Sequence, residues 1–186
     1  MRNFFSSVLE ILEIAVVAIV AVFVIRSFLV QPFLVSGLSM IPTFSNGDYL
    51  LVDELTYRFR APERGEVIVF GYPGDPSTYF IKRIIGLPNE CVVLGDSKIT
   101  VFNSNSCEPP GLVLDEKYLP QPFVPSERSP FKLASDEYLV LGDNRSFSFD
   151  SRNWGPLKKD KIVGLVRLRL WPINDFKTFA APKYQN

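Results

Sequence analysis

The sequence predicts a mainly β domain preceded by one N-terminal apolar helix. The first 30 residues hold a nearly continuous apolar run, IAVVAIVAVFVI, and the helical pattern stops at Gln31-Pro32. After this point, short segments rich in Val, Ile, Leu and aromatic residues alternate with Gly, Pro, Asn and Asp, as strands do when turns join them. We therefore expect a helix over residues 1–30 and antiparallel sheets over residues 31–186 that close partly into a barrel-like domain.

The N-terminal segment is interpreted as a transmembrane anchor. Its charge-free run from Ile14 to Ile25 is shorter than the about 20 residues that cross a bilayer, but charged side chains at its ends can snorkel. A buried core helix is the first alternative, but the run is apolar on all sides with little amphipathic contrast, which argues against it. A cleaved signal sequence is the second alternative, but no cleavage site of the small-x-small type follows Ile25, which argues against it. Arg2 and Arg26 flank the segment almost symmetrically, so charge does not orient it.

The β part contains several predicted strands and one excursion from the sheet. The last strand has period 2, with Val166, Leu168 and Leu170 on one face and Arg167 and Arg169 on the other. The composition of residues 103–130 changes to Pro, Ser, Glu and Gly, which indicates a long surface loop. The tail from Phe176 to Asn186 is expected to be frayed. The predicted strands are Asp48–Leu55, Gly65–Tyr72, Thr78–Gly86, Glu90–Gly95, Lys98–Phe102, Glu137–Asp143 and Lys161–Trp171.

Composition excludes some classes of function. Lysine plus arginine and aspartate plus glutamate are each 20, so no charge excess favours a nucleic-acid partner. Hydrophobic residues make up 47%, which is high for a soluble domain and favours membrane lipid as a partner. Cys91 and Cys107 lack histidine or further cysteines to complete a zinc site, and we expect no metal or other cofactor. They form either one disulfide or two free thiols, and the sequence leaves both open.

Ser39 is the candidate nucleophile, in the stretch PFLVSGLSMIPTF. A serine hydroxyl is a poor nucleophile until a neighbouring base takes its proton. The chain contains no histidine, which excludes both a Ser-His-Asp triad and a Cys-His pair. The base for Ser39 must therefore be a lysine, a carboxylate or a terminal amine.

Lys82 is the candidate base. A lysine becomes a usable base near neutral pH only when burial in apolar surroundings lowers its pKa. In TYFIKRIIG, strand alternation places Phe80 and Ile84 on the same face as Lys82, whereas the other lysines lie in polar or loop-like contexts. The alternative is an edge-strand lysine that points into water.

A polar stretch, LGDNRSFSFDSRNWGP from Leu141 to Pro156, follows the strand that ends near residue 143. It is either a simple polar turn or a network of ion pairs and hydroxyls that would hold a site rigid.

Taken together, the segments SMIPT, GDYLLVDE, YFIKRIIGLPNE and GDNRSFSFDSRNWG resemble type I signal peptidase. This family is the membrane-anchored Ser/Lys endopeptidase that removes signal peptides from exported proteins. The resemblance covers most of residues 32–156 outside the excursion. It implies that Ser39 is the nucleophile and Lys82 the general base. It also implies a second hydroxyl near the lysine and a surrounding polar framework, which fall on Ser148, Asp150, Arg152 and Asp143.

The resemblance further implies the substrate and the location. Preproteins would lie extended along a strand edge, with small side chains at the first and third positions before the cut. The catalytic domain would lie on the outer side of the membrane. Some members carry a serine at the position of Gly37 that helps bind the oxyanion, so here backbone amides, that of Ser39 first, would do so. We expect the pocket to be lined by Phe33, Val35, Met40 and Ile81.

Two other functions fit parts of the sequence. VSGLSM also resembles the nucleophile segment of self-cleaving repressor-type Ser/Lys proteases, but no helix-turn-helix or cleavage site precedes it. A membrane-tethered β domain that only binds extended peptides is the second alternative. Such a binding module would have no need for Lys82 on an apolar face.

Overall fold

The computed structural model describes residues 10–20, 30–95, 98–119, 130–182 and 184. Residues 10–20 form a helix whose side chains are exposed along its whole length. Within the described residues, no helix combines the length and the apolar character needed to cross a membrane. The remaining parts of the predicted anchor, residues 1–9 and 21–29, lie outside the described residues.

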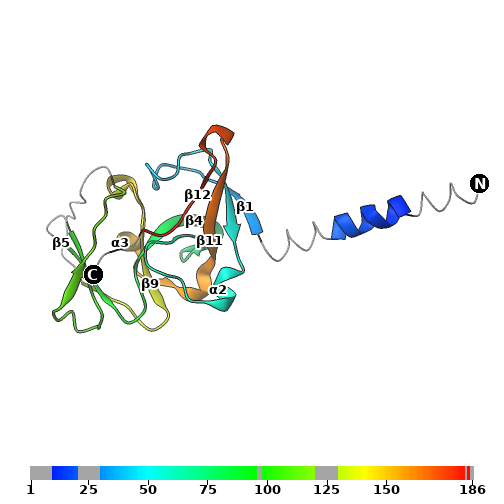
Figure 1. Cartoon of the computed structure of the whole chain (residues 1–186). Helices are drawn as coiled ribbons and strands as arrows, with labels where there is room; N and C mark the ends of the chain where they lie inside the picture. The colour runs from blue at the N-terminus through cyan, green and yellow to red at the C-terminus, as the bar shows by residue number, and fades with distance from the viewer. Residues whose placement is uncertain (1–9, 21–29, 96–97, 120–129, 183, 185–186) are drawn as a thin grey trace, which may run out of the picture.

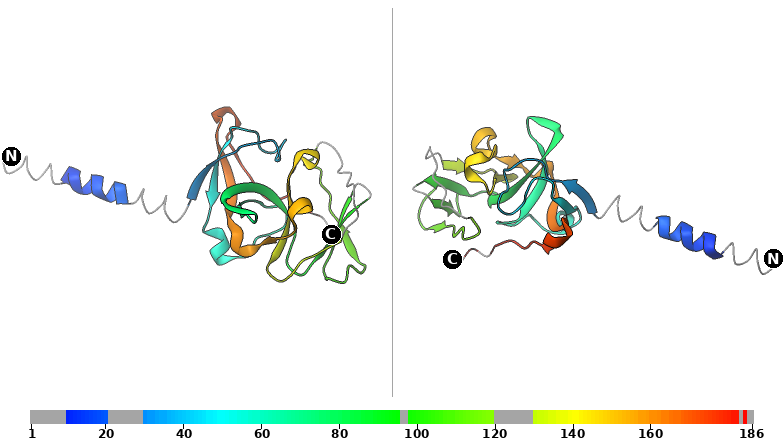
Figure 2. Two further views of the ribbon diagram at one scale, coloured as in Figure 1. Left: turned by 180° about the vertical axis from the view of Figure 1, so that it is seen from behind. Right: turned by 90° about the horizontal axis from the view of Figure 1, so that it is seen from above.

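Two antiparallel sheets make up the β part (Figure 1; Figure 2). The larger sheet has the order β1-β2-β11-β3-β4-β9-β10, with β12 paired to β11. The smaller sheet has the order β7-β6-β5-β8, and α3 and β9 lie between it and the β1–β2 end of the larger sheet (Figure 1). The strands are β1 (Val30–Leu34), β2 (Tyr49–Asp53), β3 (Val67–Tyr72), β4 (Asp75–Gly86), β5 (Cys91–Gly95), β6 (Lys98–Phe102), β7 (Gly111–Val113), β8 (Pro130–Lys132), β9 (Glu137–Leu141), β10 (Leu157–Lys158), β11 (Ile162–Trp171) and β12 (Lys177–Thr178). The short helices are α2 (Thr56–Phe59), α3 (Ser151–Trp154), η1 (Arg145–Phe147), η2 (Lys159–Lys161) and η3 (Ile173–Asp175).

The prediction of a mainly β fold is confirmed, and each predicted strand overlaps an observed one. The expected partial closure into a barrel is not found in the described strands, because β1 and β10 end the sheet order and do not pair with each other. β1 was not predicted as a strand because Pro32 interrupts the pattern there. A proline is tolerated in β1 because this strand lies at the sheet edge, where one backbone N–H is not needed for pairing.

The segment after β1 is held by the core. Met40 is 1% exposed and Phe44 0%, and both pack with residues of β2, β3 and β11. Met40 lies within the turn that begins at Ser39 and Phe44 directly follows it, so burial of these apolar side chains fixes the path of the turn. A second core cluster joins β4 and β9 to the smaller sheet.

The alternation predicted for the last strand fails at Arg169. β11 changes register against β2 between Val166 and Leu168 and again after Arg169, as a β-bulge does. Arg167 is exposed, but Arg169 turns inward, is 9% exposed and forms an ion pair of 3.0 Å with Asp48.

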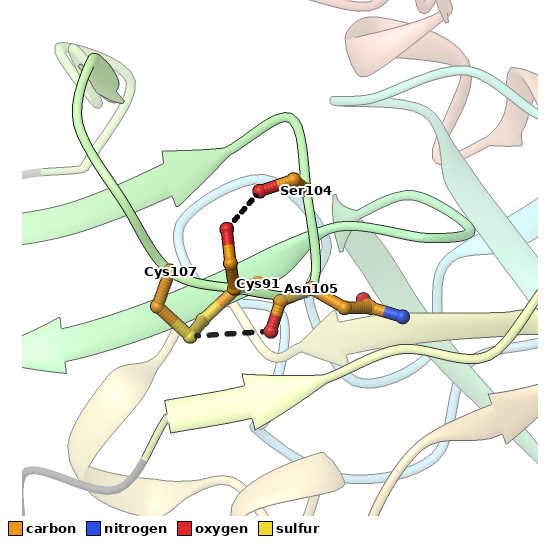
Figure 3. The surroundings of a disulfide bond; sticks show 5 residues. Cys91, Ser104, Asn105 and Cys107 are labelled. Carbon is orange, nitrogen blue, oxygen red and sulfur yellow. Dashed lines mark hydrogen bonds between the residues drawn. A yellow bond between two sulfur atoms is a disulfide. The ribbon is translucent and has the colours of Figure 1, made fainter.

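The excursion contains a strand that was not predicted, and the tail is more ordered than expected. Residues 111–113 of the excursion form β7, which pairs with β6, whereas residues 120–129 lie outside the described part. A disulfide joins Cys91 at the start of β5 to Cys107 of the excursion, near Asn105 (Figure 3). The expectation of a frayed tail is wrong for Phe179, whose ring centroid lies 4.4 Å from that of Phe44, and for Tyr184, which packs against the second core cluster.

Candidate active site

Ser39 and Lys82 meet although 43 residues separate them. Lys82 Nζ donates a hydrogen bond of 2.8 Å to Ser39 Oγ and one of 2.9 Å to the carbonyl oxygen of Ile81. Ser39 lies in the turn after β1, where Gly37 adopts a positive φ of 101° that favours glycine. The Ser39 carbonyl oxygen accepts a bond of 2.9 Å from the Asn144 amide. The turn is thus held against the polar stretch that follows β9.

β4 places its two adjacent basic residues on opposite faces. Lys82 is 4% exposed and its ammonium lies 5.2 Å from the centre of the Phe80 ring. Burial lowers the pKa of Lys82 from 10.5 to about 8, although the charges of Asp150 and Asp143 act in the opposite direction. A buried amine of this kind can take the proton of a hydroxyl that it contacts.

Asp150 is the centre of one half of the polar framework. Its side chain is fully buried and accepts bonds from Arg152 Nε (2.7 Å) and from the Gly142 amide (3.0 Å). Burial raises the pKa of Asp150, but the bonds and charge of Arg152 and the Gly142 amide outweigh it and hold the pKa below its usual value. Asp150 therefore stays ionised and fixes both Arg152 and the backbone at Gly142.

Asp143 is the centre of the other half. Its buried carboxylate accepts bonds from Arg83 Nε (2.8 Å), Arg83 Nη2 (2.6 Å) and Thr43 Oγ1 (2.5 Å). The Arg83 Nη1 group also donates to the Gly65 carbonyl oxygen at 2.8 Å. This bidentate pair joins the Ser39 turn, β4 and the loop after β9.

Ser148 lies where Gly142 approaches the Ser39 turn. A Cβ atom built on Gly142 would stand 2.2 Å from Ser148 Oγ and 2.5 Å from the Ser39 carbonyl oxygen, so only glycine fits there. Ser148 Oγ is buried and has no hydrogen bond of normal geometry to another described residue, although Ser148 helps to lower the pKa of Asp150. The structure thus brings Ser148 next to the Ser39 turn.

A pocket of about 330 Å³ opens beside Ser39 and Lys82. Phe33, Val35 and Ile81 line it, as the sequence analysis expected. Met40 does not line the pocket, because its side chain lies in the core beneath the turn. Sequence reasoning missed further apolar lining residues from three segments: Leu38, Tyr79, Phe80, Phe147 and Phe149.

Other missed residues belong to the framework. Arg83 follows Lys82 in an apolar strand, and a second charge in such a strand was a usable signal of a buried ion pair. Thr43 and Glu116 carried no comparable signal. Within the described residues there is no group of three or more His, Cys, Asp or Glu side chains that could hold a metal ion.

The family model and the curated relatives point to the same family. Residues 8–171 match the model of the family described as signal peptidase, peptidase S26. A probable signal peptidase I-2 of Synechocystis sp. is 38% identical over 89% of this chain and 74% of its own length. A signal peptidase I of Leptolyngbya laminosa is 35% identical over 85% of this chain and 77% of its own. A crystal structure of a signal peptidase I from Enterococcus faecalis, 27% identical, covers 57% of this chain and 97% of that chain with a TM-score of 0.47. On the sequence matches, the chain belongs to the signal peptidase family, peptidase S26.

Proposed function

We propose that this protein is a membrane-bound serine endopeptidase that cleaves signal peptides from preproteins, with Ser39 as nucleophile and Lys82 as general base. The observation that carries the proposal is the 2.8 Å contact between Lys82 Nζ and Ser39 Oγ at a lysine whose pKa burial lowers to about 8. No cofactor is needed for this chemistry.

The reaction begins when neutral Lys82 accepts the Ser39 proton and the resulting alkoxide attacks the scissile carbonyl carbon. The Ser39 amide makes no hydrogen bond to another described residue and is free to bind the oxyanion. Lys82 then gives the proton to the leaving amine. In the second half, Lys82 takes a proton from water and the hydroxide attacks the acyl carbon. The bond from that carbon to Ser39 Oγ then breaks, and Lys82 returns the proton to Ser39 Oγ.

The substrate would lie extended in the pocket beside Ser39. β1 is an edge strand, and the side of β4 that faces β9 begins to pair only at Arg83, so both can accept backbone bonds from an added strand. The apolar pocket is narrowed by the side chains of Phe33, Val35 and Ile81. A narrow pocket favours substrates with small side chains next to the scissile bond. The Ser39 and Lys82 pair is held in place by residues that do not touch the scissile bond: Asp143, Asp150, Arg152 and Ser148.

Residues 1–30 would anchor the β-rich catalytic domain, residues 31–186, to the lipid bilayer. The described part of this segment, residues 10–20, is a helix with apolar side chains such as Ile14 and Ile19 that are 69% and 68% exposed. Exposure of these apolar side chains to water is unfavourable in free energy, and insertion into a bilayer would remove it. The catalytic domain would then lie on the outer side of the membrane, where exported preproteins emerge.

The first prediction tests the dyad. Ser39→Ala and Lys82→Ala should each reduce cleavage of a preprotein in detergent to background, because one removes the nucleophile and the other the base. Ser148→Ala should lower the rate by less. The measurement is the initial rate of mature-protein formation on gels.

The fold must survive for this test to count, so the melting temperature of each variant is compared with the parent. Lys82→Met, which keeps the apolar stem without the amine, should fail in the same way. Near-normal cleavage by either Lys82 variant would refute the dyad, and a parent chain that cleaved no preprotein would favour the binding-module alternative.

A further inference from the structure

Glu116 connects the excursion to the buried framework of the active site. Its carboxylate accepts two parallel bonds from Arg145, at 2.6 Å from Nη1 and 2.5 Å from Nη2. The Arg145 side chain is only 5% exposed and that of Glu116 is 12% exposed. Bidentate pairing of buried groups is directional and strong, so Glu116 sets the orientation of the guanidinium.

Arg145 in turn holds the loop that touches Ser39. Its Nε donates a bond of 2.9 Å to the Gly142 carbonyl oxygen, while Asp150 holds the Gly142 amide. Gly142 and Asn144 of the same loop meet the Ser39 carbonyl, Gly142 by close packing and Asn144 through its amide. A path of direct contacts therefore runs from Glu116 through Arg145 to the backbone of Ser39.

Tyr118 provides a second contact between the excursion and the framework. Its ring lies 4.4 Å from the Arg83 guanidinium, and its hydroxyl donates a bond of 2.6 Å to Glu116 Oε1. Burial is the main reason why the pKa of Tyr118 is raised, so the phenol remains protonated and keeps this donor. The same short segment thus contacts both Arg83 and Arg145.

Charge balance makes Glu116 part of the framework rather than a surface group. Arg83 and Arg152 are paired with Asp143 and Asp150, and the buried Arg145 receives its carboxylate from Glu116. Burial lowers the pKa of Arg145, but its hydrogen bonds to Glu116 and the charge of that carboxylate more than reverse the shift. Removal of one partner from such a pair leaves a buried charge without its counter-ion.

We propose that Glu116 is a positioning residue for the Ser39 nucleophile, acting through Arg145 and the loop of residues 142–149. The excursion is then a working part of the active site. This inference rests on the proposed function of the dyad and adds to it a residue that the sequence placed in a variable surface loop.

The test compares Glu116→Gln with Asp115→Asn in the full chain in detergent. Both variants remove one negative charge from the same segment. Among the described residues, however, Asp115 forms its ion pair with Lys117 at the surface, where their side chains are 51% and 86% exposed. Glu116→Gln should lower kcat about tenfold and change KM by less than threefold, because misplacement of reacting groups by ~1 Å costs up to ~100-fold in rate. Asp115→Asn should leave both constants within twofold.

Hydrogen exchange gives a readout independent of cleavage. Amides of residues 142–149, including the Asn144 amide bonded to Ser39, should exchange faster in Glu116→Gln and at the parent rate in Asp115→Asn. Glu116→Asp, which keeps the carboxylate, should restore part of kcat and part of the protection of these amides from exchange. Tyr118→Phe, which keeps the ring and loses the bond to Glu116, is the milder variant if Glu116→Gln folds poorly.

Parent-like kcat and parent-like exchange in Glu116→Gln would overturn the inference while leaving the dyad intact. The inference would also be overturned if the fall in kcat were no larger than the fraction of unfolded protein explains, and if the amides of the folded molecules exchanged at the parent rate. If the parent chain cleaved no preprotein, the proposed function would fail, and the exchange comparison would still decide whether Glu116 holds the loop.

Discussion

At the scale of single residues, the chemistry depends on how the protein lowers the pKa of Lys82. A pKa of about 8 leaves roughly one Lys82 in ten neutral at pH 7, against roughly three in ten thousand for a lysine at 10.5. The shift also affects stability. Between pH 8 and 10.5 the unfolded chain binds more protons at this lysine than the folded protein does. Below about pH 8 the lysine is charged in both states, and its burial lowers the free energy of unfolding. This loss of stability disappears as the pH rises from 8 through 10.5, because the folded protein then holds the lysine in its neutral form.

The rate of cleavage should therefore depend on pH. As the pH rises, kcat/KM for preprotein cleavage should increase with the neutral fraction of Lys82 and level off above about pH 8. The measurement is kcat/KM in detergent from pH 6 to 10, over the range where the protein keeps its near-ultraviolet circular dichroism.

Two carboxylate variants test the assignment of this midpoint to Lys82. Asp150 raises the pKa of Lys82 by its charge, so Asp150→Asn should move the midpoint to lower pH, whatever its effect on the maximal rate. Asp136→Asn, at an exposed site next to Lys158, should leave the midpoint in place. A midpoint that Asp150→Asn does not move would assign the titration to another group.

At the scale of elements, β4 and the C-terminal tail position the framework from two sides. β4 carries Lys82 toward Ser39 and Arg83 toward Asp143 because successive side chains of a strand point to opposite faces. The tail covers the Arg83 side: Tyr184 Oη lies 3.4 Å from Tyr118 Oη, and a Cβ atom on Gly65 would stand 2.9 Å from Pro182. The tail thus closes over the ion pair that β4 makes.

Truncation of the tail aromatic residue should therefore lower stability. Tyr184→Ala should reduce the free energy of unfolding by about 2 kcal/mol, because a partly buried aromatic side chain is lost from its place against the core. Phe176→Ala, at a residue that is 60% exposed, should change it by less than about 0.5 kcal/mol. Urea unfolding followed by tryptophan fluorescence measures both. Equal effects of the two variants would contradict docking of the tail.

At the scale of the whole molecule, the protein combines a β core with an apolar N-terminal segment whose described part, residues 10–20, has exposed side chains. The helix over residues 10–20 has no buried residue, whereas Met40 and Phe44, which hold the Ser39 turn, are almost fully buried. An apolar helix left uncovered by its own protein needs another apolar environment. Placement of the catalytic domain at the membrane would bring Ser39 close to substrates still held in the bilayer.

A charge in the middle of the apolar segment should weaken membrane insertion. The full chain should float with phospholipid vesicles and resist carbonate extraction, and Val17→Lys should increase the extracted fraction because a central lysine costs about 2.5–3.5 kcal/mol. Glu10→Lys, nearer the end, should have little effect since its ammonium can snorkel. Complete carbonate extraction of the parent chain would refute the anchor.

The site was predictable where local patterns report burial. The absence of histidine and the apolar neighbours of Lys82 made Lys82 the candidate base for Ser39. The resemblance to type I signal peptidase implied this pair as well, and it alone assigned Asp143, Asp150 and Arg152 to the framework. Met40 was misplaced because an apolar residue next to a nucleophile can face either the pocket or the core. Arg169 was misplaced because a bulge reverses the alternation of a strand.

By itself, the sequence determined the mainly β fold, the apolar segment and the family, because periodicity, turn residues and short motifs are local properties of the chain. Only the tertiary structure decided which further side chains meet: Arg83 with Asp143, Arg145 with Glu116, and Cys91 with Cys107. The physical reason is that these pairs join segments far apart in the chain. Their contact depends on sheet order, register and the packing of the core, none of which a local pattern contains.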